Sequence, residues 1–424
     1  MARSLPSWTT FVLWGFAVFQ LITLVLAIPN PNDLEIFLDA SQELVDGGNV
    51  YTIGYRQGYR FFYGLAFAYV IAPLNALPLA LAKMLWGLLG MVLLWRSYRI
   101  VAAWAGLDTW PLERQRLVQA IAALVLLQAV RDNLNTCQAS FVLLWCCLEG
   151  IEQALRGRPV LAAVIVAFGI DMKLLPLIVV PYWVYRATWR PLLVLPFALA
   201  LWVAAPLLLT GKERGADMLR SRVELLNPTD KRHVLDDEEP DFIALGSLIS
   251  AYGGGDHVRD YGVTLPRRVV RMTDEQVGKF TWLARLVLGL GMVIVLRLPP
   301  FRPAPSGLQR ACEVGYLLAS IPLIFPHQQN YAMLYMAPAV LYLAMAATEA
   351  PPSRAPGKGV LIAGALLLLG ANVHLLFGSF FWFHDHYKLL SFTLLFVLVL
   401  LVRARPGATA LQAPIGKHGD EQVG

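Results

Sequence analysis

Long stretches without acidic residues constrain this chain most. Asp and Glu are absent between Leu65 and Leu107, and Asp171 is the only acid between Val160 and Leu209. A membrane-spanning helix needs about 20 mainly apolar residues, and these stretches supply them. The composition agrees, because 57% of the residues are hydrophobic and only 15% are charged, whereas soluble domains contain roughly 25% charged residues. The sequence therefore predicts an all-α polytopic integral membrane protein.

The apolar runs predict about 11–13 membrane segments. They lie near 9–28, 62–80, 83–100, 117–131, 138–155, 159–171, 174–185, 191–209, 281–297, 311–325, 331–347, 359–377 and 388–402. Segments 159–171 and 174–185 are short and separated by Asp171-Met172-Lys173. Polar interruptions are tolerated at membrane depth where a segment lines a cavity. We therefore expect a re-entrant pair or one broken helix there.

Basic residues predict the orientation of the chain. Arg and Lys gather in short connections, which the positive-inside rule places in the cytoplasm. Residues 1–402 then form one transmembrane domain, with a first extracytoplasmic loop at 29–61 and a long one at 210–280. Residues 403–424 are expected to be a disordered cytoplasmic tail. Thirteen spans would put the termini on opposite sides, so one segment between 62 and 186 is expected not to cross.

Several classes of function lack a sequence signal. The net charge of +6 follows from the basic connections, and no basic face typical of nucleic-acid binding is visible. The four cysteines have no metal spacing and fit packing roles. In His384-Asp385-His386 the two imidazoles converge poorly on a helix, so we expect no metal there. No nucleotide-phosphate loop is present, which disfavours direct use of a nucleotide sugar, and no cofactor is expected.

The first predicted loop contains the strongest catalytic candidate. Asp33 follows Pro29-Asn30-Pro31 and opens a short amphipathic helix, on which Phe37 and Ala40 share its face. A carboxylate at the membrane surface can act as a general base. The alternative is that Asp33 only caps this helix. Both interpretations stay open at the level of sequence.

Basic residues predict where an anionic group would bind. Lys173 lies in an apolar region, where a cation is a functional hypothesis, although it could also pair with Asp171 or reach an interface. His327 stands beside three amides, in a pattern typical of a polar pocket. Arg56 and Arg60 lie among tyrosines, and the Arg fork suits a phosphate, while the tyrosines alone would fit an interfacial belt.

Amides and one tyrosine complete the predicted site. The polar break from Arg131 to Gln138 could be an ordinary turn, but polar residues that begin a span usually face protein or a cavity. The expected substrate-binding residues are Tyr63, Asn133, Asn135, Gln138 and Gln328.

Four groups of residues, in this order, carry a resemblance to a known family. The first runs from Asp33, Phe37, Ala40, Gly47-Gly48 and Tyr51 to Tyr63, Ala72-Pro73-Leu74 and Leu77-Pro78. Asn133-Leu134, Gln138 and Arg156-Gly157-Arg158 form the second. The third is Lys173-Leu174-Leu175-Pro176, and the fourth is Pro326-His327. Over Asp33–Tyr342 the chain resembles glycosyltransferase family 87, the GT-C class mannosyltransferases that use polyprenyl-phosphate mannose and were once a domain of unknown function.

The resemblance implies a fold, a reaction and a location. It implies an inverting transfer of a hexose, with mannose expected, from a polyprenyl-phosphate donor to a glycan or glycolipid acceptor. Asp33 would be the general base, and Lys173, His327, Arg56 and Arg60 would bind the donor phosphate. The enzyme would be a multi-pass protein of the inner (plasma) membrane, acting on its extracytoplasmic face in cell-envelope glycolipid biosynthesis.

The sequence also departs from the family pattern. Tyr63-Gly64-Leu65 stands where a doubled proline is expected, and Gln328-Gln329 stands where paired histidines are common. Thr136-Cys137-Gln138-Ala139 and Ala244-Leu245-Gly246-Ser247-Leu248 also differ from the corresponding motifs. The donor and acceptor sugars therefore stay open. Two other functions remain as alternatives, a transporter or flippase of an anionic lipid or solute, and a noncatalytic scaffold.

Overall fold

The protein is all-helical throughout the part of the chain that the computed structural model describes. That part comprises residues 7–227, 233, 235–237, 239–254, 263, 265–296, 300–304, 306–348, 357–378 and 381–406. Five helices are long and apolar enough to cross a membrane, and a sixth span forms if α5 and α6, which meet at a bend of 55°, are counted as one. The prediction of an all-α polytopic membrane protein is confirmed. Residues 407–424 of the expected tail lie outside the described residues.

The helices follow the predicted apolar runs closely. Their bounds are α1 Ser7–Ala27, α2 Asp33–Asp46, α3 Leu65–Ile71, α4 Leu79–Ala105, α5 Leu112–Val125, α6 Leu127–Asn135, α7 Ser140–Leu155, α8 Pro159–Met172, α9 Val179–Tyr185, α10 Trp189–Thr210, α11 Lys212–Leu225, α13 Leu245–Gly253, α14 Asp274–Leu296, α15 Gly307–Ala319, α16 Ile321–Ile324, α17 Ala337–Thr348, α18 Lys358–Ala371, α19 Val373–Phe377, α20 Phe381–His386 and α21 Leu389–Ala404. Short 3-10 turns include η2 Ala72–Ala76, η4 Leu175–Ile178 and η5 Asn330–Met336.

The predicted span 62–80 is wrong as a span. It consists of the seven-residue α3 and the turn η2, and both of its ends lie at the same end of the molecule. At its start the Gly64 N–H donates to Met172 O (3.1 Å), and near its finish Asn75 donates to Leu38 O in α2 (3.3 Å). The segment therefore turns back beside α2, and which segment between 62 and 186 does not cross stays a prediction.

Gly64 explains one departure from the family pattern. A Cβ at this position would lie 2.4 Å from the backbone oxygen of Asp171, so only glycine allows the two chains to approach. Proline would also remove the N–H that bonds to Met172, because its ring nitrogen carries no hydrogen. The glycine thus fixes the start of α3 against the end of α8.

One buried ion pair and several hydrogen bonds hold helix α2 against its neighbouring helices. Lys83 in α4 binds Glu35 in α2 (2.6 Å) and also donates to the carbonyl oxygens of Ile28 and Asn30. From the other side, Arg214 in α11 donates to Leu44 O (2.7 Å). Helix α2 is consequently fixed to α1, α4 and α11, although it is short.

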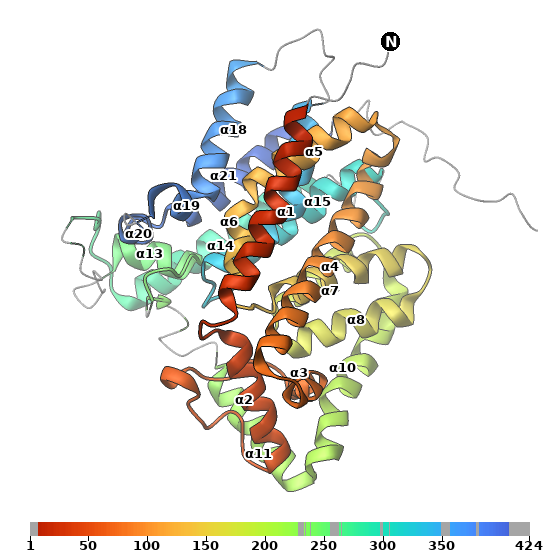
Figure 1. Cartoon of the computed structure of the whole chain (residues 1–424), viewed down its shortest axis with the longest axis vertical. Helices are drawn as coiled ribbons and strands as arrows, with labels where there is room; N and C mark the ends of the chain where they lie inside the picture. Colours follow the sequence, from red (N-terminus) through yellow and green to blue (C-terminus); the bar gives the residue numbers. More distant parts are fainter. Residues whose placement is uncertain are drawn as a thin grey trace, which may run out of the picture.

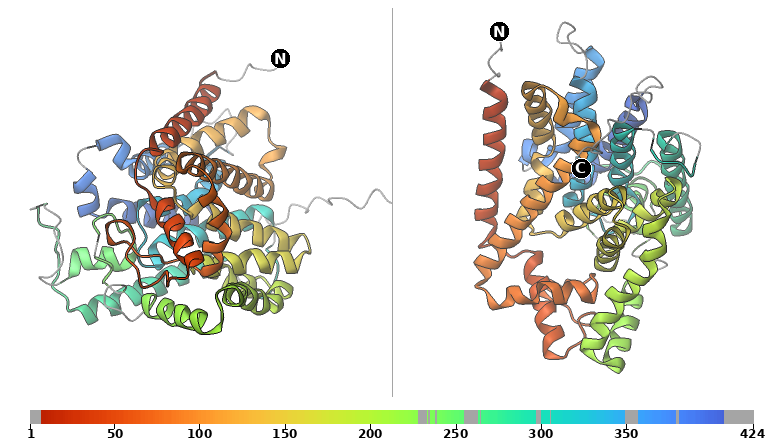
Figure 2. Two further views of the ribbon diagram at one scale, coloured as in Figure 1. Left: turned by 60° about the horizontal axis from the view of Figure 1, so that its bottom comes forward. Right: turned by 90° about the vertical axis from the view of Figure 1, so that its right-hand side faces the viewer.

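The molecule has two chemically different ends. Helices α2, α3 and α11 lie together at the bottom of Figure 1 and again at the bottom of the right-hand view of Figure 2. We call this region, together with the start of α7 and the end of α8, the Asp33 end. The opposite end, which we call the Arg186 end, contains the finish of α7 and α9 and the starts of α8, α10 and α15.

Candidate active site

Asp33 is not used to cap its helix. Asn32 is the N-cap residue of α2 and makes no side-chain capping bond. The carboxylate of Asp33 instead accepts a hydrogen bond on Oδ2 from Gln138 Nε2, and the Asp33 N–H donates to Thr136 O (3.1 Å). Within the described chain no donor is bound to the second carboxylate oxygen, Oδ1. One oxygen is therefore oriented, while the other is available to a ligand.

The surroundings of Asp33 raise the pKa of its carboxyl into a range that suits a general base. Burial raises the pKa of Asp33 to about 6, partly offset by the Gln138 hydrogen bond and by the charge of Lys173. The negative charge of Glu239 raises the pKa further. A base with a pKa near the working pH combines an adequate ionised fraction with adequate basicity.

Lys173 carries a cation that the described residues leave without an anionic partner. Its Nζ lies 5.7 Å from the centre of the Tyr63 ring and 5.9 Å from that of Tyr331. Asp171, the partner considered from the sequence, is instead bound by Arg222 (2.8 Å). Tyrosine rings hold an ammonium by cation–π attraction without neutralising it. The Lys173 ammonium is therefore positioned so that an anionic ligand could bind to it.

Tyr331 is held by Asn133 in α6, and Tyr63 is held by Phe37 in α2. The Asn133 side chain donates to Tyr331 O (2.7 Å) and to Ala129 O in its own helix (2.8 Å). Tyr63 packs edge-on against Phe37 in α2, with ring centres 4.7 Å apart. The amide nitrogen of Asn133 is occupied by these two carbonyl groups, while its oxygen has no hydrogen-bond partner among the described residues. The predicted contact of Asn133 with substrate stays a prediction.

His327 belongs to a second polar group beside the first. Its backbone adopts φ 55°, a conformation that costs energy outside glycine and marks functional sites. The His327 N–H donates to Asp236 Oδ1 (2.8 Å), and its ring Nε2 is bonded to Nδ1 of His233. Burial raises the pKa of Asp236 to about 7. The His327 ring also stacks on the ring of Phe62, which precedes Tyr63 in the chain, with ring centres 6.2 Å apart.

Glu239 connects the two groups. It accepts a hydrogen bond from Gln329, which lies beside the His327 turn, and its charge acts on Asp33. The segments around Asp33, Lys173 and His327 therefore meet at the Asp33 end, although they lie far apart in the sequence.

The side chains of the other predicted site residues are exposed or bound to other groups. Arg56 is bound by Glu35 and by Asp39 (3.1 Å), and Arg60 and Asn135 are exposed. Gln328 is buried and donates to Pro326 O (3.0 Å). Their roles toward substrate stay predictions.

Several residues that the fold brings to the cluster were not among the predicted site residues. They are His233, Asp236, Glu239 and Tyr331. His233 supplies a second imidazole to His327, at a place where paired histidines had been expected from adjacent positions. His233, Asp236 and Glu239 all lie within the long loop predicted at 210–280. In the described chain no three His, Cys, Asp or Glu side chains gather to hold a metal.

Together these features define a polytopic membrane protein with a buried carboxylate, a cation and aromatic side chains at one end of its helices. The chain belongs to glycosyltransferase family 87, whose model matches residues 61–326. It is therefore a glycosyltransferase, which uses a sugar donor and an acceptor. This assignment decides against the transporter and scaffold alternatives. No curated protein matches the sequence.

Proposed function

We propose that the protein transfers a hexose, with mannose expected, from a polyprenyl-phosphate donor to a glycan or glycolipid acceptor. Transfer takes place with inversion at the anomeric carbon, on the extracytoplasmic face of the inner (plasma) membrane. The observation that carries the proposal is the Asp33 carboxylate, oriented by Gln138 and near the uncompensated cation of Lys173. The family match begins at residue 61, so the role of Asp33 rests on this geometry and on the resemblance.

Asp33 acts as the general base in this mechanism. Its Oδ1 takes the proton from an acceptor hydroxyl while that oxygen attacks the anomeric carbon of the donor sugar. The bond between the anomeric carbon and the phosphate oxygen breaks, and the electron pair leaves with the polyprenyl phosphate. A single displacement of this kind needs one carboxylate and inverts the configuration.

Lys173 stabilises the leaving group. The departing phosphate gains negative charge in the transition state, and a preorganised cation in a site with little water stabilises such charge strongly. Tyr63 and Tyr331 hold the ammonium without cancelling its charge. His327, bonded to Asp236 and His233, is the second candidate for contact with the phosphate.

An apolar cavity close to His327 suits the lipid part of the donor. The cavity has a volume of 540 Å³ and lies between α13, α14 and α21. Its lining is apolar almost throughout and includes Leu248, Ile249, Leu283, Val287, Phe392 and Leu395. Helix α13 begins shortly after Phe242, whose ring centre is 5.3 Å from that of His327. Burial of an isoprenoid chain there is favourable at roughly 25 cal/mol per Å² of apolar surface.

The experiment compares label transfer by wild type and Asp33→Asn. Reconstituted protein receives radiolabelled polyprenyl-phosphate mannose and a membrane-glycolipid extract as a source of acceptor. Removal of a general base lowers turnover by about 100- to 10,000-fold. Asp46→Asn is the matched control, because Asp46 is an exposed acid at the far end of the same helix, and it should leave transfer unchanged.

Each outcome bears on a separate part of the proposal. Near-normal transfer by Asp33→Asn would refute the role of Asp33. If wild type fails with mannose, the assay is repeated with other polyprenyl-phosphate sugars, and transfer of one of these would correct the donor sugar. Failure with all of them, while labelled acceptor forms from another donor class, would refute the use of a lipid-phosphate donor.

A further inference from the structure

A second cavity lies at the Arg186 end, far from the candidate active site. It has a volume of 510 Å³ and is bounded by the finish of α7 and α9, the starts of α8 and α10, and the segment before α15. Helix α7 begins beside Gln138, and α8 ends beside Gly64. The cavity at their other ends is therefore separated from Asp33 by the length of these helices.

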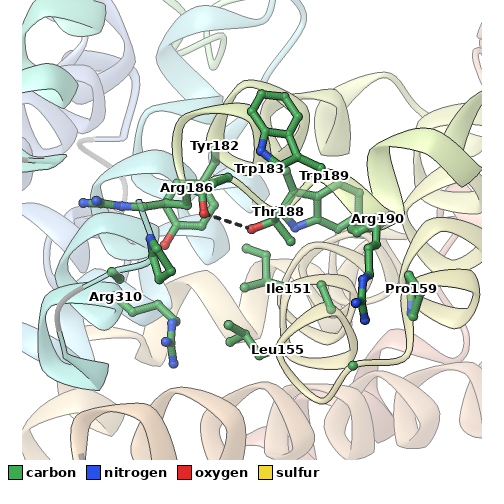
Figure 3. Close-up of a pocket in the computed structure, with 16 residues that line it drawn as sticks. Ile151, Leu155, Pro159, Tyr182, Trp183, Arg186, Thr188, Trp189, Arg190 and Arg310 are labelled. Atoms are coloured by element: carbon green, nitrogen blue, oxygen red, sulfur yellow. Dashed lines mark hydrogen bonds between the residues drawn. The ribbon is translucent and has the colours of Figure 1, made fainter. Parts of the chain in front are cut away.

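The lining of this cavity is cationic. Of the 16 lining residues three are arginines, Arg186, Arg190 and Arg310, and none is a carboxylate. Arg186 is neutralised by Glu313 and also donates to Leu296 O. Arg190 and Arg310 form no ion pair with any described residue. Figure 3 shows Arg190 and Arg310 on opposite sides of Leu155 in the lining of the cavity.

A buried donor without an acceptor also lies at this cavity. Trp183 is 1% exposed and lines the cavity, yet its indole Nε1 has no hydrogen-bond partner among the described residues. An unsatisfied buried N–H costs about 1–3 kcal/mol, so such groups usually have a partner when the site is filled. This second, independent feature indicates that the cavity takes a ligand with hydrogen-bond acceptors.

The surroundings of the cavity are those of a lipid interface. Ile151, Leu155 and Trp183 give it an apolar interior. Val160 and Leu193, next to the lining residues of α8 and α10, expose 60% and 73% of their surface, as side chains facing hydrocarbon do. Basic pockets between membrane helices, with Trp and Arg at the headgroup level, are suited to phosphate headgroups.

We propose that this cavity binds the phosphate headgroup of an anionic membrane lipid from the leaflet opposite Asp33. Arg190 and Arg310 hold the phosphate oxygens, Trp183 Nε1 donates to an oxygen of the headgroup, and the lipid glycerol and first carbons pack on Leu155 and Ile151. This inference does not depend on the proposed donor or acceptor, because it concerns the other end of the molecule.

The test measures lipid binding to the full chain in a neutral detergent. Short-chain phosphatidylglycerol, short-chain phosphatidylcholine and inorganic phosphate are titrated separately, and bound lipid is counted by native mass spectrometry. Wild type should bind phosphatidylglycerol at least about tenfold more tightly than either other probe, because a charge-assisted bond and apolar burial each add to affinity. Transfer activity and elution profile report whether each variant is folded.

The variants are Arg190→Gln, Arg310→Gln and the double substitution. Each single variant should bind phosphatidylglycerol about tenfold more weakly, as expected for the loss of one charge-assisted contact. Arg190 is exposed, so its single variant should fold even if the double variant does not. Arg99→Gln is the control, because Arg99 is an exposed arginine of α4 that does not line the cavity, and it should bind as wild type does.

Two results would overturn the proposal. Unchanged phosphatidylglycerol binding by Arg190→Gln and Arg310→Gln would remove the cavity as the site. Inorganic phosphate that binds as tightly as phosphatidylglycerol would show that the lipid portion contributes nothing, and the site would be one for a free anion.

Discussion

Both ends of the helical bundle contain buried charged groups, but the Glu313 and Arg186 charges have more bonding partners than those of Asp33 and Lys173. At the Arg186 end, the Glu313 carboxylate accepts bonds from Arg186, Tyr182 (3.1 Å) and Gln309 (2.7 Å). At the Asp33 end, the Lys173 ammonium lies over the rings of Tyr63 and Tyr331 and forms no ion pair with a described residue. The structure describes one hydrogen-bond donor to the Asp33 carboxylate. A fully bonded charge cluster stabilises a structure, whereas an incompletely bonded one is available to a substrate. We therefore expect the Arg186–Glu313 charges to act on stability and the Asp33 and Lys173 charges to act on substrate.

The largest effect should come from breaking the structural cluster. Glu313→Ala leaves the Arg186 guanidinium buried without its partner, which should lower the free energy of unfolding by about 3–5 kcal/mol. Thermal unfolding of the purified protein in detergent measures this change. The matched double variant Arg186→Met/Glu313→Leu removes both charges and should recover most of the stability. Wild-type stability in Glu313→Ala would contradict the structural role.

Lys173→Gln should show the opposite pattern. It removes a buried cation that forms no ion pair with any described residue, so stability should stay equal or increase. Transfer should fall by about 30- to 150-fold, or about 2–3 kcal/mol, because the developing phosphate charge loses its cation. The quantities to measure are kcat/KM and the unfolding midpoint, on the same preparation. Loss of stability with little loss of transfer would show that Lys173 stabilises the fold and does not act on the donor phosphate.

Arg56→Gln should have the smallest effect. Arg56 was predicted from the sequence to bind phosphate, but its guanidinium is bound by Glu35 and Asp39 and is about half exposed. Exposed pairs contribute about 0–1 kcal/mol, so transfer should fall less than about fivefold. Steady-state kinetics with varied donor concentration check this. A rise in KM as large as that of Lys173→Gln would instead support phosphate binding by Arg56.

The helices were largely predictable from the sequence, because hydropathy and proline positions are local properties. Each predicted span contains a helix. The predicted span 62–80, however, contains only the seven-residue α3 followed by the turn η2. Its return depends on contacts of Gly64 with Met172 and of Asn75 with Leu38. Hydropathy cannot report such contacts.

The site was predictable in part. Asp33 and Lys173 stood out because polar residues are rare next to apolar runs, and the structure brings Asp33, Gln138, Lys173 and Tyr63 together. His233, Asp236 and Glu239 lie in a polar loop, where charged residues are ordinary. Their importance arises only from the tertiary contacts with His327 and Gln329.

The central claim is that Asp33 is a base whose pKa is set by its neighbours. The pH dependence of kcat/KM tests it most directly, because this ratio reports ionisation in the free enzyme. Wild type should lose activity as pH falls through about 6, since protonated Asp33 cannot accept a proton. Gln138 and Lys173 both lower the pKa of Asp33. The acidic limb should therefore move to higher pH in Gln138→Met and in Lys173→Gln, with Asp46→Asn as the unshifted control. An acidic limb at the same pH in all four proteins would contradict the account.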